Sequence, residues 1–340
     1  MPHSLKVAAV QMNAEPAARE KRLSRAESLI GRAASQGAKL VVLPEVFNTG
    51  YVYSDQNYRL VETLHGKTVA WMKDTTKKYN IYLAGSLLLR EGDEIYNSML
   101  LVAPDGRQWR YDKSYPWAWE RAYFRNGRSP VIAETPLGKF GLLICWDMAH
   151  TRLWRAYAGK VDAVLVSSCP PSMHKVNLVF PDGKQLPMND LGPMVRSTYR
   201  GAEGAFGAFP RRQAAWLGAP MVNATISGKF SSHLPRPRFS AAVFFAMRPG
   251  LWKYIPQAGK ILIECGYFNE TFIADADGQV LAQSPGNEEC FVIHSVTIAD
   301  ELPKARGKQP AFGMSRLAYF VDWLVNQWMG GYYRKHAKRP

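Results

Sequence analysis

Three strand-like segments of this chain each end at a chemically reactive side chain. The apolar run LVVLPE ends at Glu45, DGRQWRYDK ends at Lys113, and KFGLLIC ends at Cys145. A thiol is a weak nucleophile until a base removes its proton, and the oxyanion that it generates needs a fixed positive charge. The three segments therefore predict a fold in which strand ends bring a carboxylate, an ammonium and a thiol to one site.

Composition restricts the class of protein. The chain has 340 residues, of which 47% are hydrophobic, which suffices for one large domain or two small ones. No 18-residue apolar run predicts a membrane-spanning helix, and the N-terminus is a better first strand than a secretory signal. Four cysteines without CxxC or Cys/His metal spacing indicate a reduced, cytoplasmic protein, in which we expect Cys169, Cys265 and Cys290 to be inert.

Strands outnumber helices in the predicted secondary structure. We expect helices at 16–36 and 67–79, and strands at 5–12, 39–46, 81–89, 135–147, 162–169 and 220–228. Hairpins are predicted around Pro104-Asp105-Gly106, and between ETFIADADGQVLAQ and EECFVIHSVTI with a turn at Asp277-Gly278. This pattern favours α/β or α+β layers over a doubly wound sheet. Residues 171–215 and 229–262 are expected to be long functional or interface-forming loops.

The segments VVLPEVF, YDKSYPWAWERAYF and GLLICWDMAH, in this order, resemble the nitrilase superfamily of carbon–nitrogen hydrolases. The similarity runs from Val7 to about Ile298. It implies a four-layer αββα sandwich over residues 1–300, with insertions at about 171–215 and 229–262. It also implies a homo-oligomer, a Glu-Lys-Cys triad, and chemistry that needs neither a metal nor an organic cofactor.

The resemblance assigns roles to the reactive residues. Glu45 would take the proton of Cys145 and later activate water, while Lys113 and the backbone N–H of Trp146 would stabilise the oxyanion. Cys145 would form a thioester, or a thioimidate with a nitrile. The family has a second active-site Glu about seven residues after the Lys, and Glu120 fits that position. Glu120 would pair with Lys113 or orient substrate, or else form a simple surface ion pair.

Other residues are candidates for the substrate pocket or for the core. Tyr51, Trp117 and Trp119 are aromatic and near the motifs, so each is either a pocket wall or core. His150 lies where many family amidases have Phe-Pro-Glu, and it is either pocket-lining or an ordinary loop residue, as is Arg152. Asn223, in MVNATISG, resembles a family segment beside the active site.

Three functions remain open at this level. Cys-Trp-Asp, where nitrilases commonly have Cys-Trp-Glu, favours a small amide substrate over a nitrile. The same thioester would also serve acyl transfer to an amine. A retained hydrolase fold acting as a membrane-surface or assembly scaffold is the third reading.

The C-terminal region, residues 301–340, is predicted to be a basic amphipathic tail. Its helix would carry Phe, Trp and Tyr on a wide apolar arc before the run RKHAKR. Aromatic and basic residues together are typical of an interfacial membrane helix, and a partner subunit is the alternative. The net charge of +15 also favours anionic partners, although no nucleic-acid-binding motif accompanies it. We therefore expect a cytoplasmic protein, either free or peripheral on the inner face of a membrane.

Overall fold

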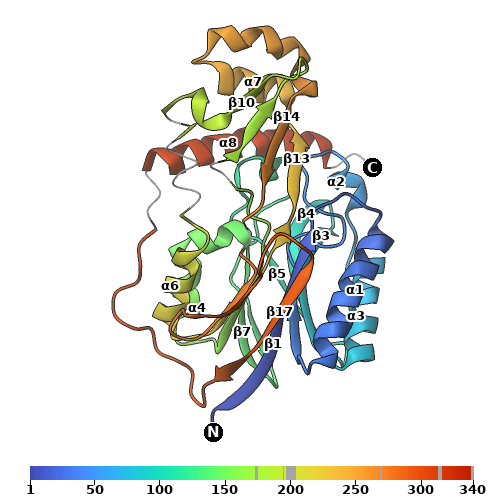
Figure 1. Ribbon diagram of the computed structural model, residues 1–340, viewed down its shortest axis with the longest axis vertical. Coiled ribbons are helices and arrows are strands. Elements are labelled where there is room, and N and C mark those ends of the chain that lie inside the picture. The colour runs from blue at the N-terminus through green and yellow to red at the C-terminus, as the bar shows by residue number, and fades with distance from the viewer. Residues whose placement is uncertain (173–174, 194, 197–203, 269, 313–315, 338–340) are drawn as a thin grey trace.

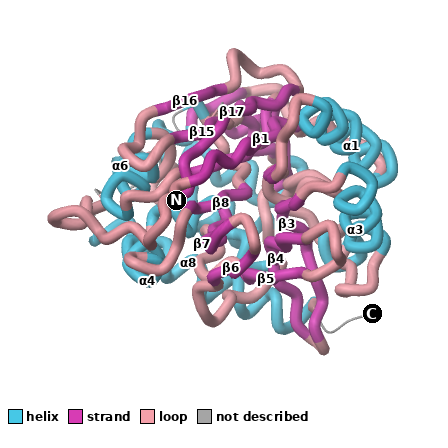
Figure 2. The backbone as a smooth tube through the Cα atoms, turned by 90° about the horizontal axis from the view of Figure 1, so that it is seen from below, coloured by secondary structure: helices cyan, strands magenta, loops and turns pink. Residues whose placement is uncertain are grey.

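Two β-sheets stacked face to face form the centre of the protein, and each carries helices on its outer face (Figures 1 and 2). The computed structural model describes residues 1–172, 175–193, 195–196, 204–268, 270–312 and 316–337. This helix–sheet–sheet–helix order confirms the predicted αββα sandwich. A large apolar core lies between the sheets, and a second lies under the helices of the first sheet.

The first sheet has the order β12-β1-β2-β3-β4-β5, with β17 also paired to β1. Its strands are β1 (His3–Asn13), β2 (Leu40–Val42), β3 (Tyr82–Glu91), β4 (Glu94–Val102), β5 (Gln108–Asp112), β12 (Ile226–Ser227) and β17 (Cys290–Ile298). Helices α1 (Arg19–Ser35) and α3 (Lys67–Tyr79) cover it, and the short α2 (Asn57–Leu60) lies between them in sequence. The predicted apolar stripe of α1 is buried.

The second sheet has the order β16-β15-β11-β8-β7-β6. Its strands are β6 (Ile132–Thr135), β7 (Gly138–Ile144), β8 (Ala163–Ser167), β11 (Met221–Ala224), β15 (Phe272–Ala274) and β16 (Val280–Gln283). Helices α4 (Thr151–Tyr157) and α6 (Ala208–Leu217) lie outside it (Figure 2). Strands β7, β8 and β11 are parallel, so their carboxyl ends lie at the same edge.

Two predictions about the strands are wrong in detail. The segment EECFVIHSVTI does not join the final hairpin, because β17 pairs antiparallel with β1 from His3↔Ile298 to Gln11↔Cys290. That nine-residue ladder satisfies far more backbone groups than the four-residue β16 would offer. The predicted strand 220–228 is split between β11 and β12, which belong to different sheets.

A small third sheet lies beyond one end of the sandwich, at the top of Figure 1. Its order is β10-β9-β14-β13, from β9 (Asn177–Val179), β10 (Gln185–Pro187), β13 (Lys229–His233) and β14 (Leu262–Gly266). With it lie η4 (Met188–Leu191), α7 (Pro237–Phe245) and η5 (Pro249–Lys260). The expectation of loops is thus wrong for 229–262, which contains β13, α7 and η5. Strand β13 pairs with β14, which begins at Leu262 and also pairs with β9 from the other insertion.

The predicted C-terminal helix is confirmed as α8 (Arg316–His336), which crosses between the sandwich and the third sheet (Figure 1). It packs on η1 (Ala118–Ala122), where Asp322 Oδ1 accepts a hydrogen bond from the Ala118 N–H at 3.1 Å. At its far end the Tyr333 hydroxyl accepts one from the Ile95 N–H at 2.8 Å. Among the helices of the described residues, none combines the length and apolarity needed to cross a membrane.

Candidate active site

Glu45 lies three residues beyond β2, at the edge where the ends of the two sheets meet. Its side chain is fully buried. Oε1 accepts hydrogen bonds from Lys113 Nζ at 2.8 Å and from Asn97 Nδ2 at 2.7 Å, and Oε2 accepts one from Cys169 Sγ at 2.7 Å. The carboxylate is therefore held from both sides, with Oε2 turned toward the sulfur atoms of the site.

Lys113 follows β5 directly and lies between two carboxylates. Its Nζ donates to Glu45 Oε1 at 2.8 Å and to both oxygens of Glu120, at 3.0 and 2.8 Å, with its side chain 0% exposed. Burial alone would lower the pKa of Lys113, but Glu120 and Glu45 outweigh it and raise that pKa well above its usual value. The ammonium is consequently a fixed buried cation.

Glu120 belongs to η1, the short helix that α8 covers. It accepts hydrogen bonds from the Tyr51 hydroxyl and, at 2.6 Å, from the Trp117 N–H. Burial raises the pKa of Glu120, while Lys113 pulls it back. Of the alternatives considered from sequence, the ion pair with Lys113 is the arrangement observed.

Cys145 directly follows β7 and begins the 3-10 helix η2 (Cys145–Ala149). Its sulfur, the sulfur of Cys169 and a carboxylate oxygen of Glu45 all lie within 4.8 Å of one another. Burial raises the pKa of the Cys145 thiol above its usual value; the Cys169 hydrogen bond and Lys113 lower it, whereas Glu45 raises it. The thiol is thus neutral at rest and needs a base during reaction.

Backbone strain is concentrated around these residues. In the described part of the chain, five residues other than glycine have positive φ: Val46, Asn80, Ala118, Cys145 and Arg236. Val46 follows Glu45, Ala118 precedes Glu120 by two residues, and Cys145 itself has φ +46°. Each such residue costs about 1–3 kcal/mol, and such strain is common at active sites and ligand-binding sites.

Asp147 fixes the backbone around Cys145. Its Oδ2 accepts hydrogen bonds from the Tyr111 hydroxyl at 2.7 Å and the Ile144 N–H at 3.3 Å, and Oδ1 accepts one from the Tyr115 N–H at 2.8 Å. Burial raises the pKa of Asp147 to about 7, against the hydrogen bonds and Lys113, which lower it. One carboxyl group therefore ties the turn at Cys145 to the loop after Lys113.

Three site residues were missed from the sequence: Asn97, Asp147 and Cys169. Cys169, expected to be an inert strand or loop residue, lies in the site, because its Sγ donates to Glu45 Oε2 and is within 4.8 Å of Cys145 Sγ. The signal was available, since Cys169 follows a strand end as the three predicted residues do. Asn97 is a fully buried polar residue of β4, and its carbonyl also accepts a hydrogen bond from the Lys113 N–H at 2.8 Å. Cys265 and Cys290 lie on β14 and β17, outside the site.

Aromatic rings surround Trp146, the residue after Cys145. The rings of Trp117 and Trp146 have centroids 4.0 Å apart, and His150 stacks on Tyr115 at 3.6 Å. Among the described residues, neither Trp146 Nε1 nor His150 Nε2 has a hydrogen-bond partner, although both atoms are buried. Burial lowers the pKa of His150 to about 3, so its imidazole is neutral.

The remaining predicted residues are held by protein contacts. Trp119 is buried edge-on against Tyr53. Asn223 accepts from Ser168 Oγ at 3.0 Å and donates to the Glu270 carbonyl at 2.7 Å, beside the strand end that leads to Cys169. Arg152 is exposed on α4. Tyr51 packs against Tyr53 and Phe230, and its hydroxyl bonds to Glu120.

Comparison with known proteins gives a family match and several relatives. The carbon-nitrogen hydrolase family model matches residues 6–182, more than half of the chain. A "Nitrilase" of Pyrococcus abyssi is 32% identical over 181 residues, covering 52% of this chain and 66% of its own. The "Omega-amidase NIT2" of Danio rerio is 34% identical over 155 residues, which cover 42% of this chain and 56% of the relative's own length. The chain thus spans less than two thirds of the length of these curated relatives.

Solved structures support the fold. Saccharomyces cerevisiae Nit3, described as a member of branch 10 of the nitrilase superfamily, superposes with a TM-score of 0.61 at 20% identity. The match covers 88% of this chain and 91% of the other. An amidase mutant from Nesterenkonia AN1 superposes with a TM-score of 0.60 at 18% identity. That match covers 86% of this chain and 90% of the amidase chain. Together with the family match, the fold and the cluster of Glu45, Lys113 and Cys145 lead to one assignment: this chain belongs to the carbon-nitrogen hydrolase family.

Proposed function

We propose that this protein hydrolyses non-peptide carbon–nitrogen bonds, as an amidase, through a thioester at Cys145. One observation carries the proposal. A buried thiol lies within 4.8 Å of a buried carboxylate, and that carboxylate is bonded at 2.8 Å to a buried ammonium. Such a constellation joins nucleophile, base and cation, which together are what acyl transfer through a thiol needs.

The first half-reaction forms the thioester. Glu45 accepts the proton of Cys145 as the sulfur attacks the amide carbonyl carbon. Lys113 and the backbone N–H of Trp146 stabilise the tetrahedral oxyanion. The proton held by Glu45 passes to the leaving nitrogen, the C–N bond breaks, and ammonia or an amine departs.

Hydrolysis of the thioester completes the cycle. Glu45 removes a proton from water, the hydroxide attacks the thioester, and the carboxylic acid leaves as the thiol is restored. Glu120 acts by holding Lys113 through two hydrogen bonds of 2.8 and 3.0 Å. Because Lys113 is flanked by two carboxylates, it stays charged and immobile throughout.

The sequence at the nucleophile favours an amide over a nitrile. Cys145 begins Cys-Trp-Asp rather than Cys-Trp-Glu, and the relatives include an omega-amidase as well as a nitrilase. Nitrile hydrolysis and acyl transfer to an amine remain alternatives that the same triad would support. Nitrile hydrolysis would release the same acid and ammonia from a different substrate, whereas acyl transfer would yield a new amide in place of the acid.

The test combines a trapped intermediate with product analysis. Wild type, Cys145→Ala and the buried control Cys265→Ser are incubated with small aliphatic amides, the matching nitriles, and amides plus hydroxylamine. We expect an acyl mass on the Cys145 peptide, ammonia release from amides, and no adduct in Cys145→Ala. Undiminished turnover in Cys145→Ala would refute the proposal. Turnover of nitriles alone, or only with hydroxylamine, would select one of the alternatives.

We also propose that α8 brings the protein to anionic membrane surfaces. Phe320 and Trp323, whose rings stack at 5.9 Å, are 55% and 54% exposed, and Trp328 is 37% exposed. The same helix ends in Arg334 and Lys335, which are exposed. Exposed aromatic side chains beside cations on one helix favour the interface of a membrane with acidic head groups.

Point variants test this association better than removal of the tail, because deleting α8 would uncover η1 and disturb Glu120. Sedimentation with phosphatidylserine vesicles is compared for wild type, Phe320→Ser/Trp323→Ser, and the exposed control Met247→Ser. We expect the double variant to pellet less than the other two proteins. Equal pelleting would remove α8 from the proposal. If the double variant pellets as wild type does but differs from it in sedimentation velocity without vesicles, the surface formed by Phe320 and Trp323 joins subunits.

A further inference from the structure

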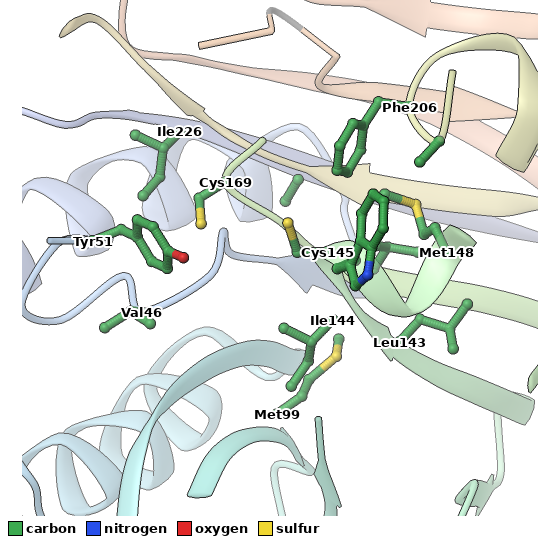
Figure 3. Packing of buried hydrophobic residues seen from close by; sticks show 14 of the residues in the cluster. Val46, Tyr51, Met99, Leu143, Ile144, Cys145, Met148, Cys169, Phe206 and Ile226 are labelled. Atoms are coloured by element: carbon green, nitrogen blue, oxygen red, sulfur yellow. The ribbon is translucent and has the colours of Figure 1, made fainter. Parts of the chain in front are cut away.

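The proposed hydrolysis uses one thiol, but the site contains two. Cys169 Sγ, Cys145 Sγ and a carboxylate oxygen of Glu45 lie within 4.8 Å of one another, and all three residues are buried. Figure 3 shows the two cysteine side chains next to each other, with Tyr51 beyond Cys169. A second thiol in contact with the proposed base is not needed for the acyl chemistry.

The two carboxylate oxygens of Glu45 have different hydrogen-bond partners. Oε1 is occupied by Lys113 and Asn97, at 2.8 and 2.7 Å. Oε2 accepts a hydrogen bond only from Cys169 within the described part of the chain, so this oxygen faces the two sulfurs. Two sulfur atoms and one oxygen thus converge from three strand ends.

We propose that Cys145, Cys169 and Glu45 form a binding site for a thiophilic divalent cation such as Zn²⁺ or Cd²⁺. Zinc takes four ligands tetrahedrally, with Zn–S near 2.3 Å and Zn–O near 2.0–2.2 Å. In that geometry two sulfurs lie about 3.8 Å apart. This spacing is within the 4.8 Å that now encloses the three atoms, so binding requires only small side-chain shifts.

Charge balance supports the site. In the resting protein Glu45 and Glu120 are compensated in part by Lys113, which leaves one net negative charge in a buried place. A dication that displaces the protons of both thiols exchanges two positive charges for two, so the buried net charge does not change. Lys113 keeps its place because it bonds the other oxygen of Glu45. Desolvation of unbalanced charge, the usual obstacle to a buried ion, is therefore small here.

Such an ion would occupy the nucleophile and the base together. The consequence is reversible inactivation by soft divalent cations, with recovery on chelation. Mg²⁺, which prefers oxygen ligands, would neither bind nor inactivate. The ion is an inhibitor in this scheme and not a participant in turnover, so its binding is measurable whether or not the hydrolase proposal holds.

The experiment measures binding directly on the full chain. Protein reduced with a phosphine is titrated with Cd²⁺ while the ultraviolet sulfur-to-cadmium charge-transfer band and proton release are recorded. We expect one ion per chain, with two protons released. Cys169→Ser should lower the affinity on the order of 100-fold or more, because loss of a direct ligand exceeds the 10–100-fold typical of outer-shell partners. Cys265→Ser, which removes another buried thiol, should bind as wild type does.

Two outcomes would overturn the site. One is the absence of a charge-transfer band in wild type, and the other is equal affinity in Cys169→Ser and wild type. Circular dichroism checks that each variant is folded, and Cys169→Ala serves as a second variant. If neither variant folds, the wild-type measurement decides, since a single thiolate ligand would release one proton per ion instead of two. Inhibition of amide turnover by Cd²⁺ is then scored separately from binding.

Discussion

Replacing Lys113 by Met tests whether the buried cation stabilises the site as well as the oxyanion. Nζ makes three hydrogen bonds of 2.8–3.0 Å to two carboxylates that are at most 2% exposed. Met has a similar length but no charge, so Glu45 and Glu120 would face each other without compensation. Removing one partner of a buried ion pair costs about 3–5 kcal/mol. We expect a loss of that size in the free energy of unfolding, together with loss of activity.

A second substitution isolates the electrostatic part. In Lys113→Met/Glu120→Gln the buried net charge returns to the wild-type value of one negative unit. This double variant should recover about half of the lost free energy of unfolding, roughly 2 kcal/mol, while activity stays absent because the oxyanion still lacks its cation. Urea unfolding followed by tryptophan fluorescence measures the first quantity, and amide hydrolysis measures the second.

The pH dependence has a defined sign. Burial already raises the pKa of Glu120, and Lys113 opposes that rise. Without Lys113 the folded-state pKa rises further above the unfolded value, so the folded form of Lys113→Met binds protons more readily. Its stability therefore falls as the pH increases, and the deficit relative to wild type should be larger at pH 8 than at pH 5. A deficit under 1 kcal/mol at pH 8, or no recovery in the double variant, would refute the reasoning.

Two further predictions concern residues that position the site. Gly127→Ala would place a Cβ 1.9 Å from the Asp112 carbonyl oxygen and displace the loop whose Gly127 N–H bonds the Lys113 carbonyl. Turnover should therefore fall by about 100-fold. Gly250→Ala is the control, because a Cβ there would meet no atom within 4 Å. Asp147→Ala leaves three donors without their acceptor and should lower the unfolding free energy by about 3 kcal/mol at low pH, as measured by urea unfolding. Because the folded-state pKa of Asp147 is raised to about 7, this deficit should shrink as the pH rises from about 4, the ordinary value for Asp, to 7, and a deficit that grows would contradict the assignment.

Local sequence signals predicted the elements that carry the site. Helix α3 was predicted with its observed bounds, and β1, β3, β7 and β8 within a few residues. The periodicity of apolar residues determines these elements because it reports which face of a helix or strand is buried. The convergence of Glu45, Lys113 and Cys145 also followed, since each lies at a strand end.

The third sheet was beyond the reach of such signals. Strands β9 and β14 pair although more than 80 residues separate them, and each alone reads as a short segment among prolines and aromatics. Pairing of distant short strands depends on the rest of the fold bringing them together. The same holds for α8, whose amphipathic pattern predicted a helix but not its contact with η1.

The short apolar runs of the sequence by themselves determined layers of strands and helices, with a carboxylate, an ammonium and a thiol at the strand ends, and the resemblance of those motifs to a known family implied the αββα sandwich. Only the tertiary structure decided what surrounds them. Asn97 and Cys169 reach Glu45 across 52 and 124 residues of chain, and no local pattern encodes those distances. The physical reason is that hydrogen bonds and ion pairs act over about 3 Å of space, whatever the separation in sequence.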